Sequence, residues 1–308
     1  MIYIKEIKHF IPKKIINDNF NVAKKFNITE EFITKKIGIR KTYYKNSSVE
    51  TSDLCVKAFN KLQYPKKKFD CIIVCTQNPD KNGIPHTSAI IHSKLKLNDN
   101  CACFDISLGC SGYIYSLSIA KSLMISNDFK NCIIFTCDPY SKIINDMDKN
   151  TSLLFSDAAT ATVLTNNKQK QKLFTPLDFL FGNDTLNHSA LNNNQEKLFM
   201  NGRTIFNFAA EKVPLHINSI LKKNKLNISD IDYFLFHQGS LAIIKYLKEK
   251  LKINDNQIVS NINKYGNTVS STIPLLMEEL GNKKKNSKII MCGFGVGLSY
   301  ATCFLRNY

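Results

Sequence analysis

The chain has 308 residues, 44% hydrophobic and 22% charged, a balance typical of globular proteins and unlike collagenous or disordered chains. The chain exceeds the usual size of one hydrophobic core, so we expect two halves. It lacks an export signal and any apolar run of the roughly 18 residues that a membrane span needs, so we expect a cytoplasmic location and no membrane partner. The net charge of +17 either reflects the composition alone or steers an acidic protein or a phosphorylated molecule toward the chain. The chain has no zinc-finger spacing, no basic–aromatic signature and no basic tail, so the charge does not indicate nucleic-acid binding.

Short apolar runs bounded by turns predict strands in the first half, after a strand-like N-terminus. A stretch with helical spacing and small residues at its start, 110–124, follows the second of these runs. The last run is a tight turn followed by a strand. These predicted elements are 69–80, 102–109, 131–138 and 153–165.

The second half repeats this order of elements. A strand ending in a polar turn precedes a helix with an apolar stripe, and a small-residue turn then leads into a second helix. A strand running into a Gly-rich loop and a final strand close the chain. These elements are 228–239, 241–251, 264–280, 286–297 and 298–306.

The two sets superpose at an offset of about 160 residues, which favours a duplicated domain. The superposition pairs Thr76 with His237, Cys110 with Asn267, and Cys132 with Lys288. We therefore expect an α/β fold of two halves, 1–166 and 173–308, joined by a polar connection at 166–172. Ligands in such folds bind beyond the carboxyl ends of the strands.

Cys110 is the strongest candidate nucleophile. Of the 10 cysteines, most lie in apolar runs typical of buried cysteines in a reducing compartment, and no CxxC spacing suggests zinc. Cys110 alone lies between glycines, Gly109 and Gly112, where a strand meets a helix. The helix dipole there is expected to lower the pKa of the thiol, and the glycines are expected to permit a strained turn and substrate approach.

Two residues of the second half are expected to join Cys110. His237, at a strand end, is suited to donate to an oxyanion or exchange a proton, and Asn267 starts a helix. Each alone is more often structural, as a strand-end histidine or an N-cap, but the repeat places Asn267 opposite Cys110. The loop 293–297 is no dinucleotide fingerprint, although its backbone N–H groups are suited to an oxyanion, and no metal-ligating pattern is present.

The chain resembles the β-ketoacyl-ACP synthase III group of the thiolase superfamily over essentially its whole length. The motifs occur in the family's order, and their combination is specific although each alone is weak. They are FDISLGCSGYIYSLSIA, LLFSDAATATV, MNGRTIFNFA, FHQGS, KYGNTVSSTIP and CGFGVGLSY.

The resemblance implies a thiolase-like five-layer αβαβα fold with two duplicated halves, usually as a homodimer. It implies that Cys110 takes an acyl group from acyl-CoA, with the backbone N–H groups of Cys110 and Val296 as the oxyanion hole. His237 and Asn267 would then stabilise the enolate that malonyl-ACP, carried by acyl carrier protein, forms on losing CO2. These are substrates, and no cofactor or metal is expected.

The resemblance also implies contacts with CoA. Phe32 stands where the family often has a Trp stacked on adenine, and a smaller ring stacks more weakly. Three basic residues match positions near the nucleotide phosphates, and three further residues belong to the motifs that bind substrate. These are Lys36, Arg40 and Lys149, and Gly202, Phe206 and Ser240.

Some positions depart from the family pattern. Ser240 replaces an Asn, and Ala242 replaces an Arg implicated in carrier docking, with Lys245 and Lys248 nearby. GFGVG replaces GFGGG, and SDAAT replaces GDGAG. These changes resemble accessory members of surface-glycan or secondary-metabolite pathways.

Four other functions remain open. One is acyl transfer to a hydroxyl or amine without decarboxylation, although retention of both His237 and Asn267 favours condensation. A hydroxymethylglutaryl-CoA synthase needs a carboxyl acid where Gln77 stands, and a papain-like protease shares only the order Cys, His, Asn. A non-catalytic basic binding protein would leave Cys110 buried and unreactive.

Overall fold

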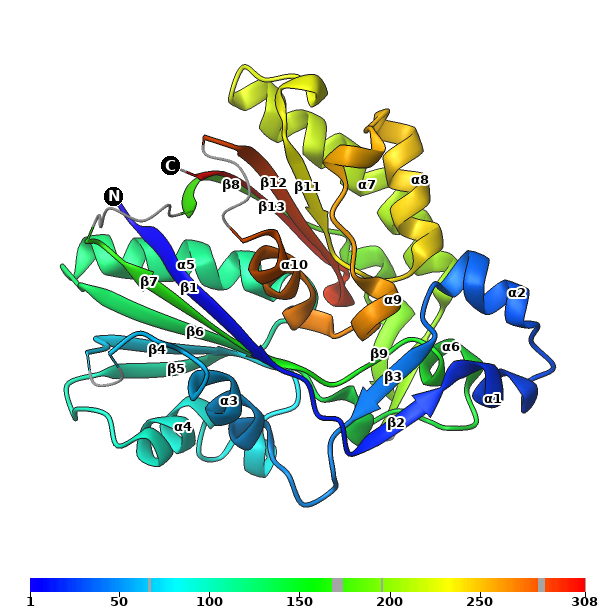
Figure 1. Ribbon diagram of the computed structural model, residues 1–308, viewed down its shortest axis with the longest axis horizontal. Helices are drawn as coiled ribbons and strands as arrows, with labels where there is room; N and C mark the ends of the chain where they lie inside the picture. Colours follow the sequence, from blue (N-terminus) through cyan, green and yellow to red (C-terminus); the bar gives the residue numbers. More distant parts are fainter. Residues whose placement is uncertain (66–67, 168–173, 195, 282–285, 308) are drawn as a thin grey trace.

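The computed structural model describes residues 1–308 except 66–67, 168–173, 195, 282–285 and 308, and it has an α/β fold (Figure 1). Within the described residues, nine strands follow one another in the order β11-β12-β13-β8-β1-β7-β6-β4-β5. The order divides between β8 and β1, which share a single register pair, Ile4 with Phe174. The sheet therefore consists of two half-sheets, one from each half of the chain.

In the first half-sheet, β5, β4 and β6 are parallel, and β7 and β1 continue it antiparallel. Strands β4, β6 and β7 are buried along their whole length, which explains their nearly continuous runs of apolar and small residues. The strands are β1 (Tyr3–Phe10), β4 (Cys71–Cys75), β5 (Ala102–Ile106), β6 (Asn131–Cys137) and β7 (Ala159–Thr165).

The second half-sheet repeats this topology. Strands β11 and β12 are parallel, β13 and β8 continue antiparallel, and a parallel bridge from Phe234 to Ile258 lies where the first half has β5. The strands are β8 (Phe174–Asn183), β11 (Tyr233–Phe236), β12 (Lys288–Gly295) and β13 (Ser299–Asn307).

Helices form three layers around the two half-sheets (Figure 1). The central helices, α5 (Gly112–Ser126) and α10 (Thr272–Leu280), each contact strands of both halves, and their apolar side chains share one core. Helices α3 (Thr51–Phe59) and α4 (Thr87–Leu95) cover the first half-sheet, and α7 (Gly202–Lys223) covers the second, with α8 (Leu241–Leu251) packed against α7. The predicted five-layer arrangement of two duplicated halves is confirmed.

Short elements surround the carboxyl ends of the parallel strands. A π-helical turn at Ile33–Ile37 packs against α8 and is followed by a left-handed Gly38. The remaining elements are β2 (Ile15–Asp18), β3 (Lys41–Tyr44), β9 (Leu191–Asn194), β10 (Lys197–Met200), α1 (Asn19–Lys24), α2 (Glu30–Phe32), α6 (Lys149–Ser152) and α9 (Ile262–Tyr265).

The predicted strands and the helix 241–251 are present, whereas β8 and α7 are not among the predicted elements. Pro214 inside α7 accounts for part of this, because an internal proline argues against a helix. Most of the predicted connection 166–172 lies outside the described residues. No helix in the described part is long and apolar enough to cross a bilayer.

Candidate active site

Cys110, His237 and Asn267 line the inner end of one cavity of about 590 Å³. Cys110 precedes α5, Asn267 precedes α10 at the equivalent place of the second half, and His237 follows β11. The exposed fractions are only 5% for Cys110, 5% for Asn267 and 3% for His237. The structure therefore brings together a thiol, an amide and an imidazole, shielded from bulk water, from three segments far apart in the chain.

Gly109 and Gly112 flank Cys110 because larger residues do not fit there. A Cβ at Gly112 would lie 2.2 Å from the Cys75 sulfur, and a Cβ at Gly109 would lie 2.6 Å from Gln77 Oε1. Neither glycine has a positive φ. Close packing against the end of β4, rather than the strained turn expected from the sequence, therefore explains both glycines.

The environment of the Cys110 sulfur favours the neutral thiol. Burial, together with the nearby Asp138 carboxylate, raises the pKa of Cys110 to about 12, although hydrogen bonds from the backbone N–H groups of Val296 and Cys110 lower it. The acidic thiol expected from the sequence differs from this environment, in which loss of hydration is the largest effect on the sulfur. Attack by this sulfur on an electrophile therefore needs an acceptor for its proton.

Gly295 gives the sulfur its space. A Cβ there would lie 2.7 Å from Cys110 Sγ, so we expect Gly295→Ala to slow acylation of Cys110 by about 10²-fold through displacement of this candidate nucleophile. The rate at which acylated Cys110 appears, followed by intact-protein mass spectrometry, measures this effect. An unchanged melting temperature would show that the fold survives, and wild-type acylation would contradict the prediction.

His237 is a neutral, hydrogen-bonded imidazole. Its Nδ1 lies 2.8 Å from Thr272 Oγ1, and its ring packs edge-on against Phe294. Burial lowers the pKa of His237 to about 3, because the charged ring would lose its hydration. At neutral pH the ring can accept a proton or donate one, depending on which nitrogen carries the hydrogen.

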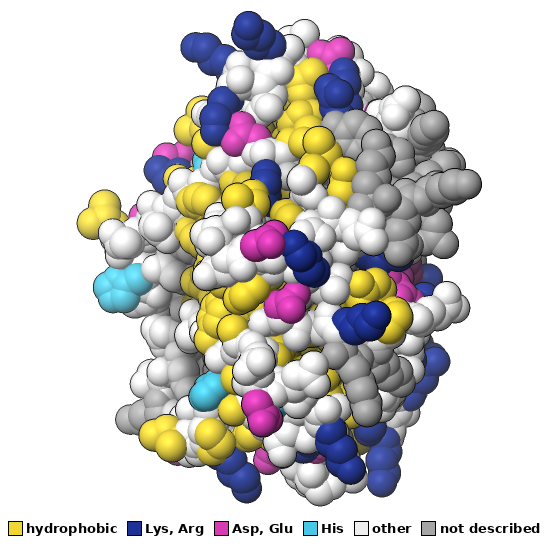
Figure 2. Space-filling model, turned by 90° about the vertical axis from the view of Figure 1, so that its left-hand side faces the viewer, with side chains coloured by type: hydrophobic (Ala, Val, Ile, Leu, Met, Phe, Trp, Pro, Cys, Tyr) yellow, Lys and Arg dark blue, Asp and Glu magenta, His cyan; other side chains and the backbone are white. Residues whose placement is uncertain are grey.

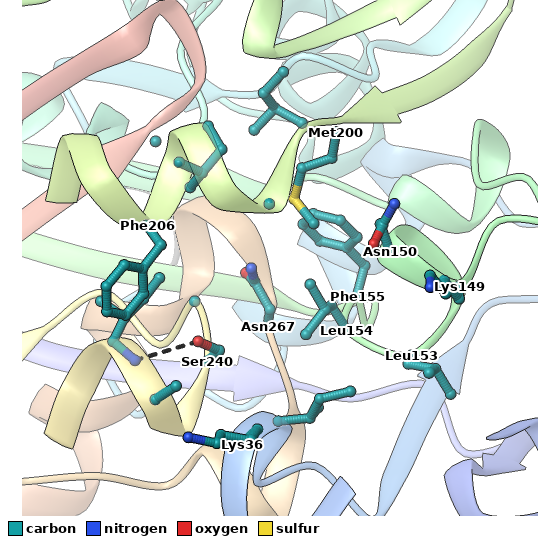
Figure 3. Close-up of a pocket in the computed structure, with 18 of the residues that line it drawn as sticks. Lys36, Lys149, Asn150, Leu153, Leu154, Phe155, Met200, Phe206, Ser240 and Asn267 are labelled. Atoms are coloured by element: carbon teal, nitrogen blue, oxygen red, sulfur yellow. Dashed lines mark hydrogen bonds between the residues drawn. The ribbon is translucent and has the colours of Figure 1, made fainter. Parts of the chain in front are cut away.

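The Asn267 amide is oriented by its own turn. The Val269 backbone N–H donates to Asn267 Oδ1 at 2.9 Å, which leaves the Nδ2 group to donate toward the cavity. Asn267 points into the middle of the cavity, with Phe155, Met200 and Phe206 around it (Figure 3). The residue thus presents a hydrogen-bond donor, not an acceptor.

The first half of the chain holds this turn in place. The backbone of Asn267 bonds with Leu154 O and Ser156 N, within the LLFSDAATATV segment. Asp138, buried at the end of β6, accepts from the N–H and hydroxyl of Ser270 and from the Gln77 N–H. These contacts stabilise Val269 at φ +53°, an unfavourable value for a β-branched residue.

Most of the predicted CoA contacts line the outer part of the cavity. Phe32 is 46% exposed at its mouth, and Lys36 and Lys149 lie on different sides of the opening (Figure 3). Gly202 and Phe206, in the first two turns of α7, and Ser240, the N-cap of α8, also line it.

Two predicted residues lie apart from this lining. Arg40 does not line the cavity; its guanidinium pairs with Asp18 at 2.7 Å and lies over the Phe20 ring. Val296 contributes its backbone N–H to the Cys110 sulfur, while its neighbours Phe294 and Gly295 line the cavity wall.

Asp138 and Thr272 were not predicted from the sequence. Asp138 follows a buried strand directly, a position that signals a polar residue at the ligand-binding edge of a sheet. Thr272 lies in the same KYGNTVSSTIP segment as Asn267, but nothing local shows that it meets His237. In the described residues, no group of His, Cys, Asp and Glu side chains is arranged to hold a metal ion.

Two family models match the chain. The model for 3-oxoacyl-[acyl-carrier-protein (ACP)] synthase III matches residues 104–184, and its C-terminal model matches residues 221–307. The first match contains Cys110, and the second contains His237 and Asn267.

Similar proteins match along almost the whole chain. A β-ketoacyl-[acyl-carrier-protein] synthase III of Campylobacter fetus subsp. fetus is 34% identical, over 96% of this chain and 95% of its own. The protein of that name from Ehrlichia ruminantium (strain Gardel) is 31% identical over 97% of each chain. The crystal structure of 3-oxoacyl-[acyl-carrier-protein] synthase III from Aquifex aeolicus VF5 has a TM-score of 0.89 and 28% identity, covering 99% of this chain and 100% of that one.

Proposed function

Because this chain belongs to the 3-oxoacyl-[acyl-carrier-protein] synthase III family, we propose that it condenses an acyl group from acyl-CoA with malonyl-ACP, with loss of CO2. The single observation that carries this proposal is the meeting of Cys110, His237 and Asn267 at the inner end of one cavity. A thiol there is suited to hold an acyl group, and two polar side chains beside it are suited to bind a second thioester.

In the first half-reaction, the Cys110 sulfur attacks the thioester carbonyl of acyl-CoA, and the CoA thiol leaves. The negative charge that develops on the carbonyl oxygen is stabilised by the backbone N–H groups of Cys110 and Val296, both of which act on the sulfur in the free protein. As the sulfur attacks, the thiol proton passes through His237 to the leaving CoA sulfur, so the ring carries a charge only transiently.

In the second half-reaction, loss of CO2 from the malonyl group leaves an enolate. Asn267 Nδ2 and the His237 ring donate hydrogen bonds to the enolate oxygen. These two neutral donors are suited to stabilise the negative charge in a site where the His237 ring is uncharged. The enolate carbon attacks the acyl carbonyl, and the Cys110 thiolate that leaves takes up a proton. Cleavage of CO2 generates the carbanion, so no strong base is required.

The outer cavity suits the pantetheine arm and nucleotide of CoA. Phe32 is placed to stack on the adenine, and Lys36 and Lys149 to pair with phosphates, while Gly202, Phe206 and Ser240 line the arm. Arg40 already has an acidic partner in Asp18, so its pairing with a phosphate requires exchange of that partner.

We further propose acyl carrier protein as the partner, on charge grounds. The net charge of +17 favours association with an acidic protein, although Lys and Arg side chains are scattered among acidic and apolar ones on the face shown in Figure 2. Lys245 is exposed on α8, whereas Lys248 pairs with Asp255. A cytoplasmic homodimer, with halves 1–166 and 173–308, completes the proposal.

A panel of acyl-CoA donors, with and without malonyl-ACP, tests the reaction. We expect one acyl adduct on Cys110 from the donor alone, and labelled CO2 with a chain-extended product once malonyl-ACP is added. An adduct without CO2 release would favour acyl transfer to a hydroxyl or amine, and no adduct from any donor would contradict both reactions.

A further inference from the structure

The Thr272 hydroxyl lies between two groups of the site. Its Oγ1 is 2.8 Å from His237 Nδ1 and 3.0 Å from the carbonyl oxygen of Val269. Thr272 is 1% exposed, at the first position of α10, so water does not compete for these hydrogen bonds. The hydroxyl has one hydrogen and two neighbours able to accept it.

This geometry allows two hydrogen-bond arrangements, which differ in the function of the imidazole. When the hydroxyl donates to Val269 O, it accepts from His237 Nδ1–H, and Nε2 is a bare acceptor. When the hydroxyl donates to Nδ1, the ring hydrogen is on Nε2, which becomes a donor. In both arrangements Nδ1 stays hydrogen-bonded, so neither leaves that nitrogen unpaired.

We propose that Thr272 is a positioning residue that supports both neutral tautomers of His237, so that one histidine serves the two half-reactions of the proposed function. The inference rests on that function, because only a two-step reaction needs both an acceptor and a donor at the same nitrogen. It concerns the residue behind the imidazole and not the imidazole itself.

The proton is accounted for in each step. During acylation, Nε2 accepts the Cys110 proton, Nδ1–H donates to Thr272, and Thr272 donates to Val269; the proton then leaves on the CoA thiol. Between the two steps the ring loses its Nδ1 hydrogen and gains one on Nε2 by exchange with water, with no net change in protons. During condensation, Thr272 donates to Nδ1, and Nε2–H donates to the enolate oxygen. The freed Cys110 thiolate takes a proton that comes from solvent, which the loss of CO2 from a carboxylate requires.

The turn before α10 holds Val269 O where this exchange needs it. Val269 has φ +53°, and its N–H is held by Asn267 Oδ1. One strained turn therefore orients both the Asn267 amide and the Val269 carbonyl oxygen, which accepts from the Thr272 hydroxyl. Asp138 fixes the next residue of the turn, Ser270.

Thr272→Val removes the hydroxyl and keeps the shape of the side chain. We expect it to slow both half-reactions by about 10-fold, with little change in the acyl-CoA concentration at half-maximal rate, because the ring loses its partner and not the substrate. Thr272→Ser should restore both rates to within about two-fold. Acylation is followed by intact-protein mass spectrometry, and condensation by labelled CO2 from pre-acylated enzyme.

Thr268→Val is the matched control. Thr268 is a buried threonine of the same turn whose hydroxyl has no hydrogen-bond partner among the described residues, so its removal should leave both rates unchanged. Rates of Thr272→Val equal to wild type, or Thr272→Ser as slow as Thr272→Val, would overturn the inference. If wild-type protein forms no acyl adduct and releases no CO2, the proposed function fails instead.

A spectroscopic measurement separates tautomer control from simple packing. In wild-type protein with isotope-labelled histidine, the two ring nitrogens of His237 should give signals averaged between the protonated and unprotonated forms. In Thr272→Val the averaged signals of these two nitrogens should differ from those of the wild-type protein. A wild-type ring locked in one tautomer would contradict the inference.

Discussion

Cys110→Ala is expected to abolish the acyl adduct and to reduce condensation by about 10⁴-fold or more, because the covalent route disappears with the sulfur. No other cysteine lines the cavity within the described residues, so none can replace it. Intact-protein mass spectrometry after mixing with acyl-CoA measures the adduct.

Cys103→Ala is the matched control for this experiment. Cys103 is a partly exposed thiol on the edge strand β5, away from the cavity. Its loss should leave the adduct unchanged, whereas adventitious acylation of an accessible thiol would be reduced. An adduct that persists in Cys110→Ala would remove Cys110 from the proposed role.

Asn267→Asp is expected to reduce CO2 release from malonyl-ACP by about 10²–10³-fold. An aspartate keeps the oxygen that accepts from Val269 N–H, so the turn is preserved. The substitution replaces the Nδ2 donor with an oxygen that carries negative charge, which repels the developing enolate. Labelled CO2 from pre-acylated enzyme measures the loss.

Acylation serves as the internal control for Asn267→Asp. The oxyanion of the first half-reaction is assigned to backbone N–H groups, so the acyl adduct should form within a few-fold of the wild-type rate. Equal loss in both half-reactions would show that Asn267 acts in acylation as well, or that the substitution disturbs Cys110.

The sequence predictions of individual helices and strands succeeded where the apolar pattern lies within the element itself. The helix predicted at 241–251 from its apolar stripe is α8, which begins at Leu241 and ends at Leu251, with Ser240 and Lys252 as its caps. The repeat predicted from the order of elements is present in the matching strand orders of the two half-sheets. The burial of β4, β6 and β12 follows from their continuous apolar runs.

Other properties of the site depend on which atoms surround a group. The pKa of Cys110 is raised by burial and by Asp138, neither of which is visible in the glycines beside it. Arg40 resembles a phosphate ligand in sequence, but the fold places it against Asp18. Thr272 and His237 are separated by 34 intervening positions, and only the packing of α10 behind β11 joins them.

The sequence by itself determined the α/β class and the duplication and singled out a candidate thiol, imidazole and amide, because hydrophobic periodicity and turn residues mark each element and the order of the elements repeats along the chain. Only the tertiary structure decided the ionisation of those groups and the direction in which the Asn267 amide points. Desolvation and hydrogen-bond geometry depend on neighbours brought from distant segments, and such contacts exist only once the two halves have packed together.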